Sequence, residues 1–239
     1  MKPHPAQPSP GHPHRRRHRV LLIDDHPMMR AGLVQLINAQ PDLLVCGETG
    51  TAAAALGLVN ELHPDLIVTD LSLPGRSGLE LVADLHTLEP DAAILVVSMH
   101  DEGFYGERAL RAGARGYIMK DAGAKLLLDA MRRVLQGDIY LSAGAAARVL
   151  AQVAGADFLR SRSPVERLTG REFEVYRLIG EGKDSDTIAR DLHLSRKTVD
   201  VHRGSIKKKL GLVSGTSLVH HAVRWREHEH RSQTRPETG

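Results

Sequence analysis

Five polar residues, spread over about 100 positions, share one local setting, the end of a short apolar run. Asp24 and Asp25 end the first run, Asp70 the second and Ser98 the third, and Lys120 follows a fourth. Three converging carboxylates repel one another, and Mg²⁺, which prefers oxygen ligands, relieves that repulsion. A carboxylate beside Mg²⁺ and a lysine can attack phosphorus, because both cations neutralise charge on the transferred group. The set therefore predicts a Mg²⁺ site at which Asp70 becomes an aspartyl phosphate.

The runs that carry these residues are short and rich in β-branched side chains, which is typical of buried parallel strands. We expect five strands, at 20–23, 43–46, 66–68, 94–97 and 117–119. Apolar residues three and four apart predict helices near 28–39, 51–62, 77–88, 103–112 and 123–136. This alternation predicts an α/β fold with a doubly wound, five-stranded parallel sheet. The carboxyl ends of its strands line one crevice, where ligands bind.

Taken singly, an aspartate at a strand end more often caps a turn than performs chemistry. The motifs around all five residues, however, resemble bacterial response-regulator receiver domains over roughly residues 20–137. They are Asp24-Asp25-His26-Pro27, Asp70-Leu71-Ser72-Leu73-Pro74-Gly75, Ser98, Ala112-Gly113-Ala114 and Gly116-Tyr117-Ile118-Met119-Lys120-Asp121. The resemblance implies a flavodoxin-like receiver fold.

The same resemblance implies how the phosphoryl group is received. Asp70 would accept it from a phosphohistidine on a sensor histidine kinase. Mg²⁺ would be held by Asp25, Asp70 and the backbone carbonyl of Ser72, with Asp24 acting partly through water. The chain would then be no enzyme, apart from intrinsic phosphotransfer and autodephosphorylation chemistry.

Three further residues have roles implied by the resemblance. Lys120 would pair with the phosphoryl oxygens, Ser98 would move to donate a hydrogen bond to them, and Tyr117 would turn inward to fill the vacated space. Ser98 and Tyr117 would then form a two-state switch whose balance is shifted by the charge of the phosphoryl group. His100, two residues past Ser98, is a candidate for setting the lifetime of the phosphoryl group.

The charge distribution predicts a second domain with a different partner. Residues 19–137 carry 16 acidic and 10 basic side chains, whereas residues 165–231 carry 10 acidic and 14 basic ones. A basic half predicts contact with a polyanion such as nucleic acid. Its apolar residues trace two amphipathic helices joined by a short break at 193–195, which is typical of a small, all-α helix-turn-helix domain.

Capping-box spacing marks the start of two helices. Thr169 and Glu172 have this spacing at the beginning of the second domain, where we expect a helix through Glu181. Ser77 and Glu80 have it at the third helix of the first domain. We therefore expect the hydroxyl of each first residue to cap its own helix.

The second helix of the helix-turn-helix would enter the major groove of double-stranded DNA. We expect DNA contacts from Ser195, Lys197, Thr198, Asp200, Val201, Arg203, Gly204, Lys207 and Lys208. Arg203 and the lysines at 207–209 would reach phosphates, giving affinity that falls as salt rises, although a lysine run alone is more often a solvated face. Asp200 could accept a hydrogen bond from the cytosine N4 amino group, or turn sideways toward Lys197 or Arg203.

This half of the chain resembles the LuxR-type helix-turn-helix of NarL/FixJ response regulators over about 165–226. The motifs are Leu168-Thr169-Gly170-Arg171-Glu172, Gly182-Lys183, Ile188-Ala189 and Lys197-Thr198-Val199-Asp200-Val201-His202-Arg203. Phe173, Thr187 and Gly204 depart from the family pattern. In relatives a fourth helix, here expected at 217–225, pairs two copies, which implies a homodimer when the protein is phosphorylated or on DNA.

The domain boundaries follow from composition. We expect a disordered tail at 1–17, the receiver at 18–137, a linker with a possible helix at 138–164, the helix-turn-helix domain at 165–231 and a disordered tail at 232–239. Cys46 is the only cysteine, which excludes an internal disulfide and fits a reducing compartment. No apolar stretch approaches the roughly 18 residues that cross a bilayer. We therefore expect a cytoplasmic protein with no membrane partner.

Together these features predict a two-component response regulator that is phosphorylated on Asp70 and regulates transcription. Two alternatives remain open from the sequence. A phosphotransferase or phosphatase for a small molecule uses the same aspartyl phosphate chemistry. A phosphate-independent DNA-binding protein could instead keep the receiver only for dimerisation.

Overall fold

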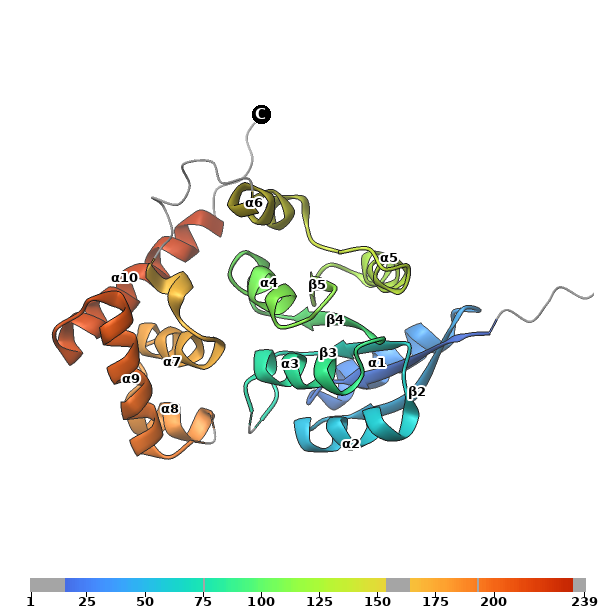
Figure 1. Cartoon of the computed structure of the whole chain (residues 1–239), viewed down its shortest axis with the longest axis horizontal. Coiled ribbons are helices and arrows are strands. Elements are labelled where there is room, and N and C mark those ends of the chain that lie inside the picture. The colour runs from blue at the N-terminus through green and yellow to red at the C-terminus, as the bar shows by residue number, and fades with distance from the viewer. Residues whose placement is uncertain (1–15, 75, 154–163, 193, 234–239) are drawn as a thin grey trace, which may run out of the picture.

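The N-terminal domain is built on one parallel sheet (Figure 1). The structure, a computed structural model, describes residues 16–74, 76–153, 164–192 and 194–233. The sheet has the strand order β2-β1-β3-β4-β5, and every pairing is parallel. Its strands are β1 (His18–Ile23), β2 (Leu43–Thr49), β3 (Leu66–Thr69), β4 (Ala93–Ser98) and β5 (Gly116–Met119). The predicted five-stranded, doubly wound sheet is confirmed, and β3 lies at its centre.

Five helices cover the two faces of the sheet, each within one residue of its predicted bounds at either end. One face is covered by α1 (Pro27–Asn38) and α5 (Ala124–Leu135), and the other by α2 (Ala52–Leu62), α3 (Gly78–Leu88) and α4 (Glu102–Arg111). Because successive strand residues point to opposite faces, Leu21 and Ile23 join the α2–α4 side of the core while Val20 and Leu22 join the α1–α5 side. The chain crosses over between β2 and β3, so the crevice opens where β1 and β3 lie side by side.

The linker begins by extending the receiver sheet. The backbone N–H of Tyr117 donates to the carbonyl of Tyr140 at 2.9 Å, and the N–H of Tyr140 donates to the carbonyl of Arg115 at 3.0 Å. The pairing of β5 therefore continues beyond Gly137, where the sequence predicted the receiver to end. The helix predicted in the linker is α6 (Ala143–Val153), and residues 154–163 of the linker lie outside the described residues.

The C-terminal domain is all helical. It comprises a 3₁₀ turn at Pro164–Arg167, then α7 (Gly170–Gly180), α8 (Ser185–Asp191), α9 (Arg196–Leu210) and α10 (Gly215–Gln233). The capping box of Thr169 and Glu172 is present at α7. The last helix is longer than the predicted 217–225 and enters the stretch predicted as a disordered tail. The tail residues 1–15 and 234–239 lie outside the described residues.

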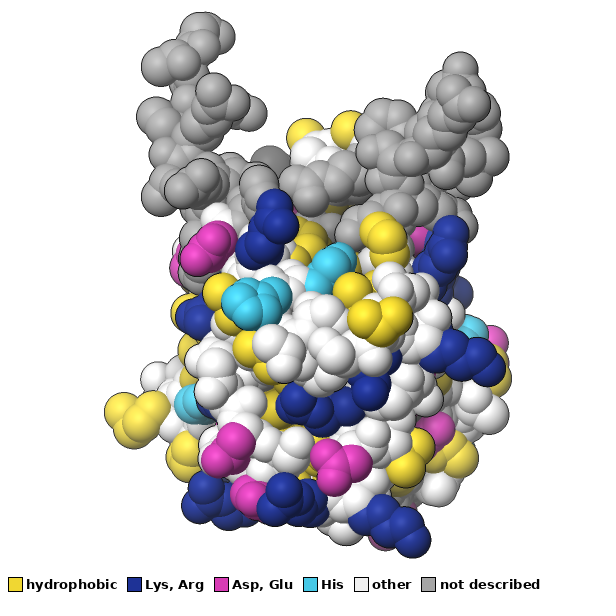
Figure 2. Space-filling model, turned by 90° about the vertical axis from the view of Figure 1, so that its left-hand side faces the viewer, with side chains coloured by type: hydrophobic (Ala, Val, Ile, Leu, Met, Phe, Trp, Pro, Cys, Tyr) yellow, Lys and Arg dark blue, Asp and Glu magenta, His cyan; other side chains and the backbone are white. Residues whose placement is uncertain are grey.

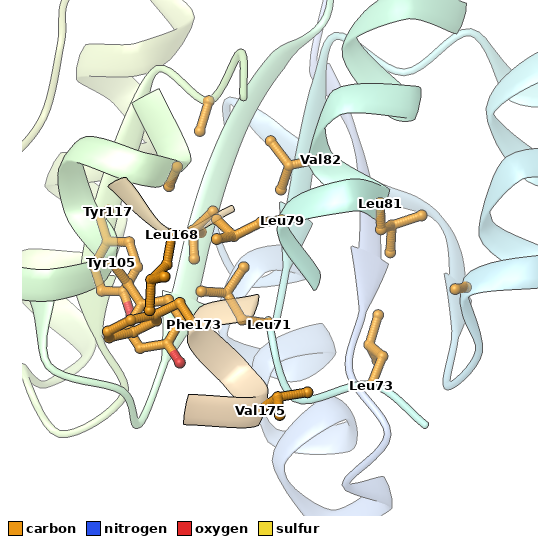
Figure 3. Close-up of a cluster of buried hydrophobic side chains, with 14 of the residues drawn as sticks. Leu71, Leu73, Leu79, Leu81, Val82, Tyr105, Tyr117, Leu168, Phe173 and Val175 are labelled. Carbon is orange, nitrogen blue, oxygen red and sulfur yellow. The ribbon is translucent and has the colours of Figure 1, made fainter. Parts of the chain in front are cut away.

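The two domains share one continuous cluster of buried side chains. Figure 3 shows Leu168 and Phe173 of the C-terminal domain beside Leu71, Leu79 and Tyr105 of the receiver. The rings of Tyr105 and Phe173 meet edge to face, with centroids 5.2 Å apart, a geometry that aromatic pairs favour. The receiver side of this contact is formed by α3 and α4.

The capping box predicted at α3 is not formed. Ser77 makes no side-chain hydrogen bond to its own helix, and its hydroxyl instead donates to Oε1 of Glu174 in α7 at 2.8 Å. The hydroxyl is engaged by the carboxylate of the neighbouring domain, and its oxygen accepts no hydrogen bond from the first turn of α3. None of the described helices is long and apolar enough to cross a membrane.

Candidate functional site

Three of the predicted residues meet at the carboxyl ends of β1, β3 and β5. The ammonium of Lys120 lies 2.7 Å from Oδ2 of Asp24 and 2.8 Å from Oδ2 of Asp70. The three side chains are 7%, 3% and 2% exposed, respectively. Burial alone would lower the pKa of Lys120, but its hydrogen bonds to the two aspartates raise that pKa above its ordinary value. The crevice therefore holds a charged lysine between two carboxylates.

Asp25 completes the acidic set from the adjacent position. Its Oδ1 atom is shielded from solvent and has no hydrogen-bond partner among the described residues. Asp24, Asp25, Asp70 and His26 each offer one ligand atom, and these atoms all lie within 4.8 Å of one another. Because a buried oxygen without a partner is costly, a hard cation such as Mg²⁺ fits this donor set.

Ser98 and Tyr117 lie beside the crevice, and both are buried. The hydroxyl oxygen of Ser98 accepts a hydrogen bond from the backbone N–H of His100 at 3.3 Å. The hydroxyl of Tyr117 donates to the carbonyl of His100 at 2.7 Å. Tyr117 therefore already occupies the inward position that the sequence predicted for the phosphorylated form.

His100 connects Ser98 and Tyr117 with the loop that follows Asp70. Its Nε2 atom lies 3.1 Å from the hydroxyl of Ser72, whose side chain is exposed. Burial, followed by the nearby charge of Arg177, lowers the pKa of His100 to about 4. The imidazole ring stacks on Tyr105 with centroids 4.8 Å apart. A neutral histidine thus bridges the loop that follows Asp70 and the surface on which the C-terminal domain packs.

Arg108 of α4 holds the C-terminal domain in place. Its guanidinium donates to the carbonyls of Leu168 and Val165 at 2.5 and 2.9 Å, and lies 4.4 Å from the centre of the Phe173 ring. The sequence reasoning missed this residue, because Arg108 reads as one more charged residue on an amphipathic helix. Nothing local to α4 indicates that backbone carbonyls of another domain are its acceptors.

The outward face of α9 is open, as predicted. Lys197, Asp200, Val201, Gly204 and Lys208 are exposed, on the side opposite the buried Val199 and Ile206. Figure 2 looks onto the outer side of the C-terminal domain, where Lys and Arg side chains cross the surface with acidic side chains below them.

Ser195 and Gly204, two residues of the predicted interface, lie at the start of α9 and on its exposed face. The hydroxyl of Ser195 caps the helix by accepting from the N–H of Thr198 at 3.0 Å. A methyl group added at Gly204 would meet nothing within 4 Å. Packing within the described chain therefore does not require glycine at this position.

Two expectations for the basic face need correction. Asp200 turns toward neither of its basic neighbours in the described structure, and instead accepts a hydrogen bond from the hydroxyl of Ser185 in α8 at 3.2 Å. Lys209 makes an ion pair with Glu172 at 2.6 Å, so it is not available for phosphates in the way that its neighbours are. Arg203 and Lys207 are half-buried.

Both halves of the chain match known protein families. Residues 20–132 match the response regulator receiver domain, and residues 166–222 match the luxR family of bacterial regulatory proteins. The nitrate/nitrite response regulator protein NarL of Escherichia coli (strain K12) is 39% identical over 197 residues, which cover 82% of this chain and 90% of that protein. This chain belongs to the NarL/FixJ family of response regulators. The resemblance identified from the motifs is thereby confirmed.

A further relative and two solved structures extend the comparison. The oxygen regulatory protein NreC of Staphylococcus carnosus (strain TM300) is 33% identical over 210 residues, covering 86% of this regulator and 97% of that one. The crystal structure of a LuxR-family two-component response regulator from Aurantimonas sp. SI85-9A1 has a TM-score of 0.54 at 32% identity, covering 58% of this chain and 99% of that one. RcsB of Salmonella enterica serovar Typhimurium bound to promoter rprA shares the fold, with a TM-score of 0.60 at 24% identity and coverage of 87% and 99%. The response regulator described here is therefore a DNA-binding transcription regulator rather than an enzyme in the usual sense.

Proposed function

We propose that a sensor histidine kinase phosphorylates this response regulator on Asp70 and that phosphorylation controls DNA binding by α9. The observation that carries the proposal is the placement of Lys120 between the buried carboxylates of Asp24 and Asp70. Phosphoryl transfer depends mainly on positioning and on neutralising charge. Lys120, already within hydrogen-bond distance of Asp70, would neutralise charge on the incoming phosphoryl oxygens. The phosphoryl group would later be lost by autodephosphorylation.

Mg²⁺ would be held by Asp25, Asp70 and the backbone carbonyl of Ser72. When bound, the ion supplies positive charge to the oxygens of the transferred group. Asp24 keeps one oxygen on Lys120 and accepts from the backbone N–H of His26 with the other, at 2.8 Å. In this proposal Asp24 contributes to Mg²⁺ partly through water.

Phosphorylation would reach the C-terminal domain through His100. A phosphoryl group on Asp70 competes for the hydroxyl of Ser98, which now accepts from the backbone N–H of His100. A shift of His100 moves the ring stacked on it, Tyr105, and Tyr105 packs edge to face on Phe173 of α7. Each step is a direct contact, so a small movement beside Asp70 changes the fit between the domains.

The contact between the domains is suited to opening. It combines an aromatic cluster with hydrogen bonds to Arg108 and Ser77, and beside it lies a cleft of about 660 Å³ lined by both domains. A contact that includes polar anchors and leaves a cleft of this size beside it allows relative domain motion. In α10, Trp225 packs edge to face on Phe104 of the receiver, with centroids 5.2 Å apart. Release would therefore free the helix that we propose pairs two copies on DNA.

The proposal is tested by supplying acetyl phosphate and Mg²⁺ and measuring the mass of the full chain. We expect a phosphoryl adduct that is lost in Asp70→Asn and kept in Asp91→Asn, since Asp91 is an exposed carboxylate. Gel filtration and fluorescence anisotropy with footprinted promoter DNA should then show dimerisation and tighter binding. An adduct that persists in Asp70→Asn would refute the assignment.

Two other outcomes would favour the alternatives. Turnover of a small-molecule phosphoester that requires Asp70 would favour a phosphatase. Promoter binding by Asp70→Asn as tight as that of the phosphorylated protein would favour phosphate-independent DNA binding.

A further inference from the structure

We propose that Asp200 selects cytosine at one position of the DNA site, by accepting a hydrogen bond from the N4 amino group of that base in the major groove. The inference rests on the proposed function, in which α9 binds DNA. It goes beyond that function because it names a base and the side chain that recognises it. Of the two orientations that the sequence left open for Asp200, the sideways turn toward a basic neighbour is not the one adopted in the described structure.

The surroundings of Asp200 leave its carboxylate open to a ligand. Residues three or four positions away on a helix are the expected ion-pair partners, and Arg196, Lys197 and Arg203 all lie at such positions. Arg196 instead pairs with Asp186 of α8 at 2.8 Å, and within the described chain the other two make no ion pair with Asp200. Asp200 is thus an exposed acidic side chain on a basic face, without a neutralising partner among the described residues.

Ser185 fixes the direction in which that carboxylate points. Its hydroxyl donates to Oδ1 of Asp200 at 3.2 Å. Ser185 is the first residue of α8, so this hydrogen bond links the two helices of the helix-turn-helix. It engages one carboxylate oxygen and leaves Oδ2 for a base. A side chain that is ordered before binding loses less entropy when the contact forms, and Asp200 is ordered in this way.

The next turn of α9 leaves room for a base pair to come close. Gly204 lies four positions after Asp200 on the same exposed face, and a methyl group added there would meet nothing within 4 Å. Glycine lets a backbone approach a ligand closely. Aspartate has a short side chain, so it reaches a base edge only if the helix lies deep in the groove. The missing side chain at position 204 permits that approach.

The pattern of donors and acceptors in the major groove decides which base suits Asp200. An ionised carboxylate accepts hydrogen bonds but donates none. Guanine presents two acceptors in this groove and thymine presents one, so both repel a carboxylate. Adenine presents an amino group beside its N7 acceptor, whereas cytosine presents its N4 amino group alone. Cytosine is therefore the base whose edge offers Asp200 a donor without an acceptor next to it.

The experiment is the selection of binding sites from random duplex DNA by the full chain, treated with acetyl phosphate and Mg²⁺. Fluorescence anisotropy with duplexes that differ at one base pair then gives the preference at each position. At one position of each half-site, the parent protein should favour cytosine over every other base by about fivefold or more. Asp200→Asn should move the preference at that position to adenine, because asparagine bonds to both N6 and N7 of adenine. Loss of folding cannot produce such a new preference.

Asp191→Asn is the matched control, because it removes the same charge from the neighbouring helix. Asp191 is exposed and pairs with Lys183 at 2.8 Å, and its replacement should leave the preference for cytosine unchanged. Ser185→Ala should reduce that preference, and an unchanged preference would overturn the role given to Ser185.

The remaining outcomes separate this inference from the proposed function. If the parent protein and Asp200→Asn select the same base at every position, the inference is overturned, while DNA binding by α9 stands. If the parent protein selects no sequence at all, base recognition by α9 fails together with the role of Asp200.

Discussion

Replacing Lys120 by methionine tests the charge balance of the crevice. Lys120 neutralises Asp24 and Asp70, and all three side chains are almost fully buried. Each hydrogen bond to a charged group contributes about 1.5–3 kcal/mol, and breaking a buried pair by removing one partner costs about 3–5 kcal/mol because a charge is left uncompensated. We expect Lys120→Met to lower the free energy of unfolding by about 3–5 kcal/mol at neutral pH without Mg²⁺.

The assay is urea unfolding followed by far-ultraviolet circular dichroism, with and without saturating Mg²⁺. A ligand that binds only the native state stabilises it in proportion to its affinity. Because Mg²⁺ would supply positive charge to the same carboxylates, it should stabilise Lys120→Met more than the parent protein. The urea midpoints of the parent protein and of Lys120→Met should therefore lie closer together when Mg²⁺ is added.

Lys183→Met provides the control for a lost lysine. Lys183 pairs with Asp191 at the same 2.8 Å, but the two side chains are 34% and 39% exposed. Exposed pairs contribute about 0–1 kcal/mol, so this variant should lose little stability and respond to Mg²⁺ as the parent does. The reasoning fails if both lysine variants lose the same free energy, or if Mg²⁺ leaves the deficit of Lys120→Met unchanged.

Three further predictions concern the switch, the domain contact and DNA. As pH falls from about 6.5 to about 4, the unfolded chain binds a proton that His100 does not take up in the folded state. The free energy of unfolding of the parent protein should therefore fall by up to about 3 kcal/mol relative to that of His100→Asn. If urea unfolding gives the same pH dependence for both proteins over this range, the prediction is wrong. Arg108→Gln should open the domain contact, because it loses charge-assisted hydrogen bonds of about 1.5–3 kcal/mol each. DNA affinity without phosphodonor, measured by fluorescence anisotropy, should rise about tenfold, and the radius of gyration should increase. The control Arg111→Gln, whose partner Glu107 lies on the same helix, should change neither quantity. Lys208→Ala should weaken binding to all DNA sequences and reduce the salt slope by about 1, and an unchanged slope would place Lys208 away from phosphates.

Most of the receiver could be predicted because its signals are local. Each strand is a short apolar run, and the residue that ends it is placed by the topology of the sheet. The meeting of Asp24, Asp70 and Lys120 follows from those two facts alone. The capping box at Thr169 was also predictable, because both of its partners lie within one turn of helix.

The contact between the domains was not predictable, because its partners are distant in the sequence. Ser77 has the spacing of a helix cap, yet its hydroxyl goes to Glu174, 97 positions away. Asp200 likewise bonds to Ser185 of the preceding helix and not to its own basic neighbours. In both cases a side chain with several possible partners took one that only the packed structure brings near.

The strand-like pairing of Tyr140 also affects how the receiver can be isolated. A fragment cut at Gly137 would leave the N–H of Tyr117 and the carbonyl of Arg115 without the partners that they have in the full chain. A bare outer strand is a template for association with other molecules. Such a truncation would form artificial dimers or precipitate, and its self-association would be mistaken for a response to phosphorylation. Ending the fragment after Ser142 avoids this artefact.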